Sequence, residues 1–187
     1  YCQLLEESVA ELRGENPEKL LLPTAEFEVD SLIPDTYVSS PAQKLSLYKK
    51  IGLARDEAHV EQVIAEMQDR YGPIPPETRN LLELARIRVL GAAAGLEFIG
   101  KIAGNVLLRP APKKGFTPDE LADLSQTFGK KLRLETEHGV RLLMPANNMD
   151  SESMLRQTIQ IVRHLHALRT KNSRNKAVLK RARTAAH

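Results

Sequence analysis

Apolar residues recur along this chain with two different periods, and each period predicts its own kind of element. Apolar positions three or four residues apart predict amphipathic helices, whereas strict alternation predicts strands with one solvated face. The segment 76–95 is apolar on most sides, so we expect its helix to lie at the centre of the core. The segments with the helical period are 1–13, 40–54, 56–71, 76–95, 117–128 and 150–168.

Capping residues mark where several of these helices begin. A side-chain oxygen just before a helix can accept a hydrogen bond from the first-turn backbone, which stabilises that end. Two of the candidates are followed three residues later by Gln or Glu, the capping-box pattern. Gly72-Pro73 is expected to end the second helix at Tyr71. The N-cap candidates are Ser40, Asp56, Thr117 and Asp150.

Alternating positions predict a small number of short strands. Ala25, Phe27 and Val29 alternate with acidic residues, which indicates a strand with one solvated face. Two later strand pairs predict antiparallel hairpins, the first with a turn at Gly104-Asn105. These pairs are Leu96–Ile102 with Val106–Leu108, and Leu132–Thr136 with Val140–Met144.

The order of these elements predicts an α+β fold rather than a strictly alternating one. Helices and hairpins occupy separate stretches, so we expect a helical cluster packed with short antiparallel β-hairpins and a long C-terminal helix. Three parts are predicted: a linker helix and loop at 1–24, the α+β domain at 25–150, and a terminal helix with a basic extension at 151–187.

Composition narrows the class of protein. The 187 residues are 42% apolar and 27% charged, which suits one well-filled domain with an appendage. No run of eighteen apolar residues is present, so a membrane-spanning helix is excluded. Cys2 is the single cysteine, which excludes a disulfide scaffold and favours a reducing, cytoplasmic setting. The chain opens on Tyr1 without a leader pattern, and we expect it to be a piece of a longer protein.

Charge is distributed very unevenly. Residues 1–152 carry 18 Lys and Arg against 24 Asp and Glu, whereas residues 153–187 carry nine Lys and Arg and no acid. This end of the chain is either a solvated helix terminus or a footprint for phosphates. Aromatic residues are only 4% of the chain, too few for a base-stacking platform. The possible phosphate contacts are Lys171, Arg174, Lys176, Lys180, Arg181 and Arg183.

Motifs for catalysis or for metal binding are not found in the sequence. There is no phosphate-binding glycine loop, no paired-cysteine spacing and no H-E-x-x-H. His164 and His166 stand two apart on a helix, so they point to different sides. Cys2 has no His or Lys beside it to lower its pKa. We therefore predict no catalytic residue, no cofactor and no metal.

A polar face on the second predicted helix is the other candidate site. At 100° per residue, Glu66 and Asp69 project together from the side opposite the apolar stripe, with Arg70 at its edge. One interpretation is a solvated face on which Glu66 and Arg70 form an ordinary i,i+4 pair. The other is a docking face, because two carboxylates one turn apart can meet a pair of guanidinium groups.

Four motifs in the first half of the chain occur in this order in one protein family. On these motifs the chain resembles the C-terminal domain of the bacterial transcription-repair coupling factors, the Mfd family. The likeness is dense over residues 25–100, weaker to about residue 168 and absent beyond, so the basic extension has no counterpart in it. The motifs are I-P-D-x-Y at Ile33–Tyr37, L-x-L-Y-K-K-I at Leu45–Ile51, E-x-x-D-R-Y-G-x-I-P at Glu66–Pro75 and L-L-E-L-A-R-I-R at Leu81–Arg88.

The resemblance implies a non-catalytic regulatory domain of an ATP-driven duplex-DNA translocase that acts in transcription-coupled nucleotide excision repair. In that family the full protein acts on RNA polymerase and recruits UvrA, and this domain docks on the protein's own UvrB-like module and masks UvrA binding. The docking contact corresponds here to Glu66, Asp69 and Arg70, and residues 1–24 correspond to the linker that follows the translocase module. The alternative is a nucleic-acid-binding module that acts through the basic extension.

Overall fold

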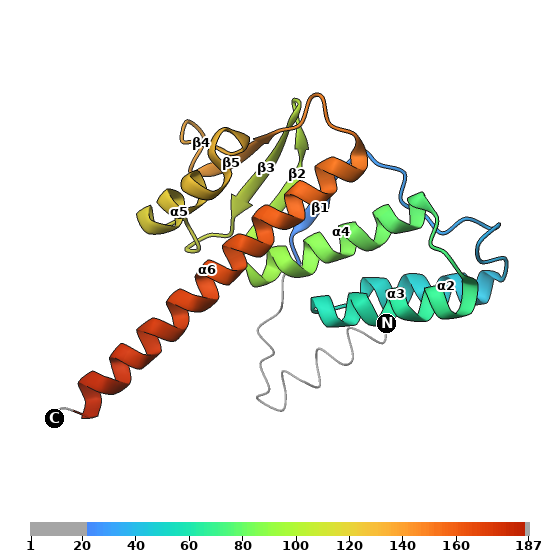
Figure 1. The fold of residues 1–187 in the computed structure, drawn as a ribbon, viewed down its shortest axis with the longest axis horizontal. Helices are drawn as coiled ribbons and strands as arrows, with labels where there is room; N and C mark the ends of the chain where they lie inside the picture. Colours follow the sequence, from blue (N-terminus) through green and yellow to red (C-terminus); the bar gives the residue numbers. More distant parts are fainter. Residues whose placement is uncertain (1–21, 186–187) are drawn as a thin grey trace.

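The computed structural model describes residues 22–185, and it confirms the α+β class (Figure 1). The helix predicted at 1–13 lies outside the described residues. The elements in chain order are β1 (Thr24–Glu26), α2 (Pro41–Gly52), α3 (Glu57–Tyr71), α4 (Pro76–Ala93), β2 (Leu96–Ile102), β3 (Asn105–Pro110), α5 (Pro118–Phe128), a 3₁₀ turn (Gly129–Lys131), β4 (Arg133–Glu135), β5 (Arg141–Pro145) and α6 (Ser151–Ala185).

The strands form one mixed sheet in the order β1-β2-β3-β5-β4. Both predicted hairpins are present, since β2 pairs antiparallel with β3 and β4 pairs antiparallel with β5. The two hairpins join through an antiparallel β3–β5 contact. β1 adds a parallel edge strand beside β2, a pairing that the alternation of residues does not reveal.

Two predicted boundaries were wrong by a few residues. The first strand ends at Glu26 instead of continuing to Val29, because the Val29 N–H donates to the Phe27 carbonyl at 3.0 Å and bends the chain out of the ladder. The first hairpin turns at Ala103-Gly104, one residue earlier than expected. Both residues have positive φ, 47° and 77°, as a two-residue turn matched to the strand twist requires.

The N-cap predictions are confirmed by hydrogen bonds. Asp56 accepts from the His59 N–H at 2.9 Å, and Asp150 accepts from the Ser153 N–H at 2.7 Å. Ser40 and Thr117 cap α2 and α5 in the same way, and α5 has the complete capping box.

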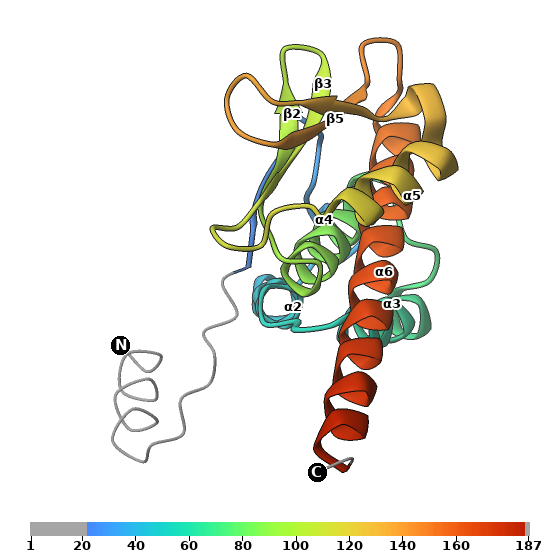
Figure 2. The ribbon, with the colours of Figure 1, turned by 90° about the vertical axis from the view of Figure 1, so that its left-hand side faces the viewer.

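Two hydrophobic clusters share helix α4, which is central as predicted. One cluster packs the sheet against α5, α6 and one side of α4, through residues such as Ile87 and Leu90. The other packs α2, α3 and the 33–38 loop against the opposite side of α4, through Leu82, Ala85 and Val89. The three helices α2, α3 and α4 with this loop are called the helical cluster below. Figure 2 shows the sheet at one end of the body, α2 and α3 at the other, and α4 between them.

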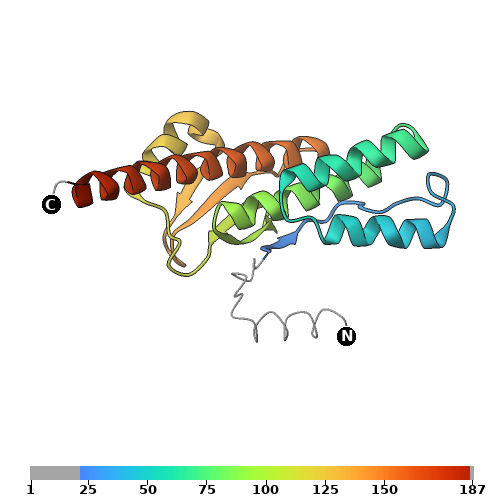
Figure 3. The same ribbon diagram turned by 90° about the horizontal axis from the view of Figure 1, so that it is seen from below.

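Helix α6 is longer than the sequence pattern predicts. Its first half packs on the body, whereas every residue from 171 to 185 is exposed. Seen from below, this second half projects beyond the body on the side away from α2 and α3 (Figure 3). Residues 151–185 contain no Gly or Pro to end the helix. None of the helices in residues 22–185 combines the length and apolarity needed to cross a membrane.

Candidate docking face on helix α3

Helix α3 presents one buried side and one solvated side, as its sequence period predicts. Val60, Val63 and Met67 are buried against the rest of the helical cluster. The helix ends at Gly72, whose φ of 82° is a backbone conformation that few residues other than glycine adopt. The predicted docking residues therefore stand on the last two turns of a helix that is fixed at both ends.

Helix α2 lies antiparallel beside α3 and supplies a residue to this face. Lys50, near the end of α2, bonds to Glu66, while Gln43, near its start, accepts a hydrogen bond of 3.0 Å from the Tyr71 hydroxyl. Lys50 was missed by sequence reasoning, because it stands 16 residues from Glu66. The signal that could have found it is the four-residue connection between α2 and α3, which favours antiparallel neighbours.

Glu66 is already engaged within the domain. One carboxylate oxygen lies 2.7 Å from the Lys50 ammonium, and the other lies 3.0 Å from the Arg70 guanidinium. The hydrogen bond from Lys50, assisted by that from Arg70, holds the pKa of Glu66 below its usual value, although partial burial opposes this. Glu66 is therefore ionised near neutral pH, and a partner's cation must compete with two local ones.

Asp69 and Arg70 are more accessible than Glu66. Asp69 is exposed and forms no ion pair with any residue in the range 22–185. Arg70 pairs with Glu66 in the predicted i,i+4 manner, and its guanidinium carbon lies 5.2 Å from the centre of the Tyr71 ring. The structure thus places Glu66, Asp69 and Arg70 together on one helix surface, with Asp69 as the free carboxylate among them.

The motifs that carried the family resemblance meet in space around this face. The Tyr37 hydroxyl donates to the Gly72 carbonyl at 2.9 Å, which joins the first motif to the third. The Tyr48 hydroxyl accepts from the Ile33 N–H at 2.8 Å, which joins the second motif to the first. Burial, followed by the charge of Tyr71, raises the pKa of Tyr37. These motifs hold α2 and α3 in a fixed arrangement.

A second group of charged residues connects α3 to α4 and α6. Arg86 of α4, whose side chain is 13% exposed, bonds to Glu57 at 2.9 Å and to Glu61 at 2.6 Å. Glu57 also pairs with Arg163 of α6. Burial alone raises the pKa of Glu57, but the hydrogen bonds from Arg163 and Arg86 lower it below its usual value. Because these residues are up to 106 positions apart, sequence periodicity alone does not predict the network.

One group of potential metal ligands comes together in the described part of the chain, and it was not found from the sequence. Glu135, Glu137 and His138 bring ligand atoms within 4.8 Å of one another at the β4–β5 turn. Glu135 is ion-paired with Arg141, a cation that competes with any metal. His164 pairs instead with Asp123 of α5.

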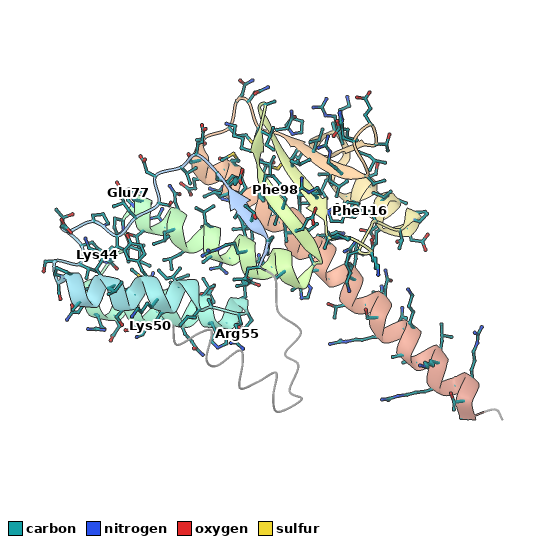
Figure 4. All side chains as sticks on the ribbon, turned by 180° about the vertical axis from the view of Figure 1, so that it is seen from behind. Lys44, Lys50, Arg55, Glu77, Phe98 and Phe116 are labelled. Carbon is teal, nitrogen blue, oxygen red and sulfur yellow. The ribbon has the colours of Figure 1, made fainter. Side chains whose placement is uncertain are left out.

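Figure 4 shows how far apart the two candidate regions lie. Lys50 and Arg55 project from the helical cluster, at the opposite end of the molecule from the last turns of α6. The six predicted phosphate contacts all lie on those last turns and are all exposed. The docking face and the basic extension are therefore separate surfaces.

Comparisons with known proteins agree on the fold and the family. The sequence profile described as the TRCF domain matches residues 27–121. The transcription-repair-coupling factor of Myxococcus xanthus is 40% identical over 89 residues, 48% of this chain and 7% of that protein. The one from Escherichia coli is 32% identical over 143 residues, 72% of this chain and 12% of that protein.

A solved structure has the same fold. It is described as the crystal structure of the C-terminal domain of transcription-repair coupling factor, and it superimposes with a TM-score of 0.70 at 20% identity. The superposition covers 81% of this chain and 96% of that one. The chain thus spans a small part of the full-length relatives and nearly the whole of that solved domain.

Proposed function

Because the chain belongs to the TRCF-domain family, as a C-terminal domain of the transcription-repair coupling factor (Mfd) type, we propose that it is a non-catalytic regulatory domain. It docks through Glu66, Asp69 and Arg70 on the UvrB-like module of its parent protein and masks the binding of UvrA. The parent is an ATP-dependent duplex-DNA translocase that acts on RNA polymerase in the cytoplasm during transcription-coupled repair.

The observation that carries the proposal is the construction of this face. Glu66, Asp69 and Arg70 lie on adjacent turns of a helix capped at both ends, and Lys50 anchors Glu66 across the helix pair. Groups held this way lose little conformational entropy when a partner binds. A face that carries both positive and negative charges favours one orientation of the partner, because shifting the partner along the face would bring like charges together.

Asp69 is the strongest candidate for the direct contact. It is exposed and has no ion pair within the described part of the chain, so a partner's guanidinium meets no internal competitor there. Glu66 and Arg70 contribute as an adjoining pair whose charges are largely balanced. A carboxylate that becomes desolvated at an interface costs about 2–5 kcal/mol when its partner is removed.

Tethering makes a modest interface sufficient. The docking module and this domain belong to one parent chain, so their effective concentration is high and the closed form dominates even if the isolated surfaces bind weakly. A coupling of about 1–3 kcal/mol changes the affinity for a masked ligand by about 5- to 150-fold.

The test replaces Asp69 with alanine, alone and together with Glu66→Ala, in the full-length parent. Affinity for UvrA is measured by titration, and melting of the isolated chain is measured in parallel. Glu28→Ala, which removes an exposed carboxylate outside α3, is the control. We expect UvrA affinity to rise in both variants and to stay unchanged in the control.

Stability distinguishes docking from a structural role. Asp69→Ala should leave the melting temperature unchanged, and adding Glu66→Ala should cost at most about 1 kcal/mol, because exposed ion pairs contribute little. Normal melting with unchanged UvrA affinity contradicts the docking assignment. A loss of several degrees in Asp69→Ala shows that the residue supports the fold instead.

A further inference from the structure

The last fifteen residues of α6, residues 171–185, form a helix without a tertiary partner among the described residues. All fifteen are exposed, and the helix continues straight out of the body (Figure 1). Its ionisable side chains are all basic. This segment is called the basic tail.

The helical geometry divides the basic residues of the tail into two stripes. At about 100° per residue, Lys176, Lys180 and Arg183 fall within about 60° of one another. Lys171, Arg174 and Arg181 fall within about 80° on nearly the opposite side of the helix. The first set is called stripe A and the second stripe B.

The surfaces between the stripes carry no charge. One contains Asn172, Asn175 and Leu179, and the other contains Ser173, Ala177 and Thr184. The exposed apolar residues Val178 and Leu179 are about 100° apart, and the arc between them holds Lys171, Asn175 and the small Ala182. The tail thus lacks the single wide apolar face with which a helix lies on a lipid surface.

Two opposed rows of positive charge suit a ligand that offers negative charge on both sides of the helix. The major groove of B-form DNA is about 12 Å wide and is bordered by the phosphates of both strands. An α-helix with its side chains is about 10–12 Å across, and fifteen residues are about 22 Å long. The major groove of A-form RNA is deep and narrow and does not admit such a helix.

We propose that the basic tail binds in the major groove of duplex DNA, with stripe A on the phosphates of one strand and stripe B on those of the other. The surface of Ser173, Ala177 and Thr184 faces the groove floor in this arrangement. Its side chains are short and uncharged, so the tail holds the DNA backbone without selecting a sequence. This surface is separate from the docking face, and the inference goes beyond the proposed function.

The experiment measures binding of the complete chain to a labelled duplex DNA of about 20 base pairs, by fluorescence anisotropy, from about 50 to 200 mM KCl. Six phosphate contacts give a log–log salt slope of about −5, at roughly 0.9 per contact. Replacing all three residues of stripe A with glutamine should make the slope shallower by about 2.7, and replacing stripe B should do the same.

A matched variant and a charge-preserving variant serve as controls. Changing the exposed Lys101, Lys130 and Lys131 to glutamine removes the same charge from the body and should leave the slope unchanged. Ala177→Pro keeps every charge but breaks the helix near the middle of the tail, so that the residues of each stripe no longer stay in line. It should abolish the preference for duplex over a single strand of equal length, while some salt-dependent binding persists.

Four outcomes overturn the proposal. They are a slope that depends on only one stripe, equal affinity of the unaltered chain for duplex and single strand, equal affinity for duplex RNA, and tighter binding to phosphatidylserine vesicles than to DNA. Equal reductions from both stripes, together with loss of duplex preference in Ala177→Pro, support it.

Discussion

Arg169 links α6 to the rest of the domain by hydrogen bonds. Replacing it with alanine should lower the free energy of unfolding by about 3–5 kcal/mol. Its guanidinium donates to the carbonyls of Ala94 at 2.7 Å, Lys114 at 2.9 Å and Gly115 at 3.1 Å, and to the Glu120 carboxylate at 3.2 Å. No later residue of α6 in the described range has a hydrogen bond to another element. Arg169 is thus the point where the packed half of the helix ends.

The magnitude follows from which acceptors remain buried after the change. Ala94 is 0% exposed and Glu120 is 5% exposed, whereas Lys114 and Gly115 lie at the surface and regain water. The Ala94 carbonyl loses its side-chain donor, which costs about 1–3 kcal/mol for a buried acceptor. Glu120 keeps the hydrogen bond from the Thr117 N–H at 3.1 Å but loses its ion pair, and a hydrogen bond to a charged group contributes about 1.5–3 kcal/mol, so the two losses together cost about 2.5–6 kcal/mol. This agrees with the 3–5 kcal/mol expected when one partner of a buried ion pair is removed.

Urea unfolding followed by circular dichroism measures the effect, with a lower midpoint expected at an unchanged slope. Arg55→Ala, which removes an exposed arginine, should stay within about 0.5 kcal/mol of the unaltered chain. Adding Glu120→Gln to Arg169→Ala should recover part of the loss, because no buried charge is then left unpaired. The coupling between the two sites should be about 0.5–3 kcal/mol.

A loss below about 1 kcal/mol in Arg169→Ala would refute this reasoning, since it means that water reaches Ala94 and Glu120 freely. If the losses of stability from Arg169→Ala and Glu120→Gln simply add in the double variant, the two side chains do not stabilise each other, which would also refute the reasoning.

Three further changes test other parts of the structure. Gly100→Ala should destabilise the domain by about 1–3 kcal/mol in urea unfolding, because the added Cβ would lie 2.7 Å from the Glu26 carbonyl oxygen and would force β1 away. An unchanged urea midpoint argues against that close approach. Glu57→Gln should destabilise the domain at about pH 6 but have less effect at about pH 3. Burial raises the pKa of Glu57, but the hydrogen bonds from Arg163 and Arg86 keep it below 4.5. The stabilisation from the Glu57 carboxylate is therefore present above that pH and is lost as pH falls through the folded-state pKa. A difference in stability between the two proteins that does not change with pH excludes the ionic contribution. DNA binding by the basic tail should differ by less than tenfold among duplex sequences at fixed salt, measured by competition, and a larger preference indicates base contacts.

Local chemistry explains which parts of the fold the sequence could predict. Ser40, Asp56, Thr117 and Asp150 cap helices through contacts three residues away, so a short window of sequence contains the whole signal. Short apolar segments on either side of turn residues predicted both hairpins for the same reason. Helical periodicity predicted the helices of the helical cluster. The four family motifs all lie in this cluster, although they do not say which atoms join them.

Long-range partners explain what the sequence could not provide. The parallel pairing of β1 with β2 joins residues more than seventy positions apart, and no periodic pattern encodes that choice. Lys50 became part of the candidate site only when α2 and α3 were placed side by side. Glu66, Asp69 and Arg70 were found from helical spacing, but the engagement of Glu66 and the freedom of Asp69 depend on tertiary structure.

The position of helix α4 between two hydrophobic clusters affects how an applied force is transmitted through this domain. The two sides of α4 belong to different hydrophobic clusters, so unfolding of α4 uncovers residues of both clusters at once. Amide hydrogens of α4 should therefore exchange only in the global opening reaction, and those at the ends of the sheet should exchange earlier. We expect a load applied at α3 to reach the sheet through this shared helix and through the pair of Glu57 with Arg163 of α6, so that the domain yields as one mechanical unit.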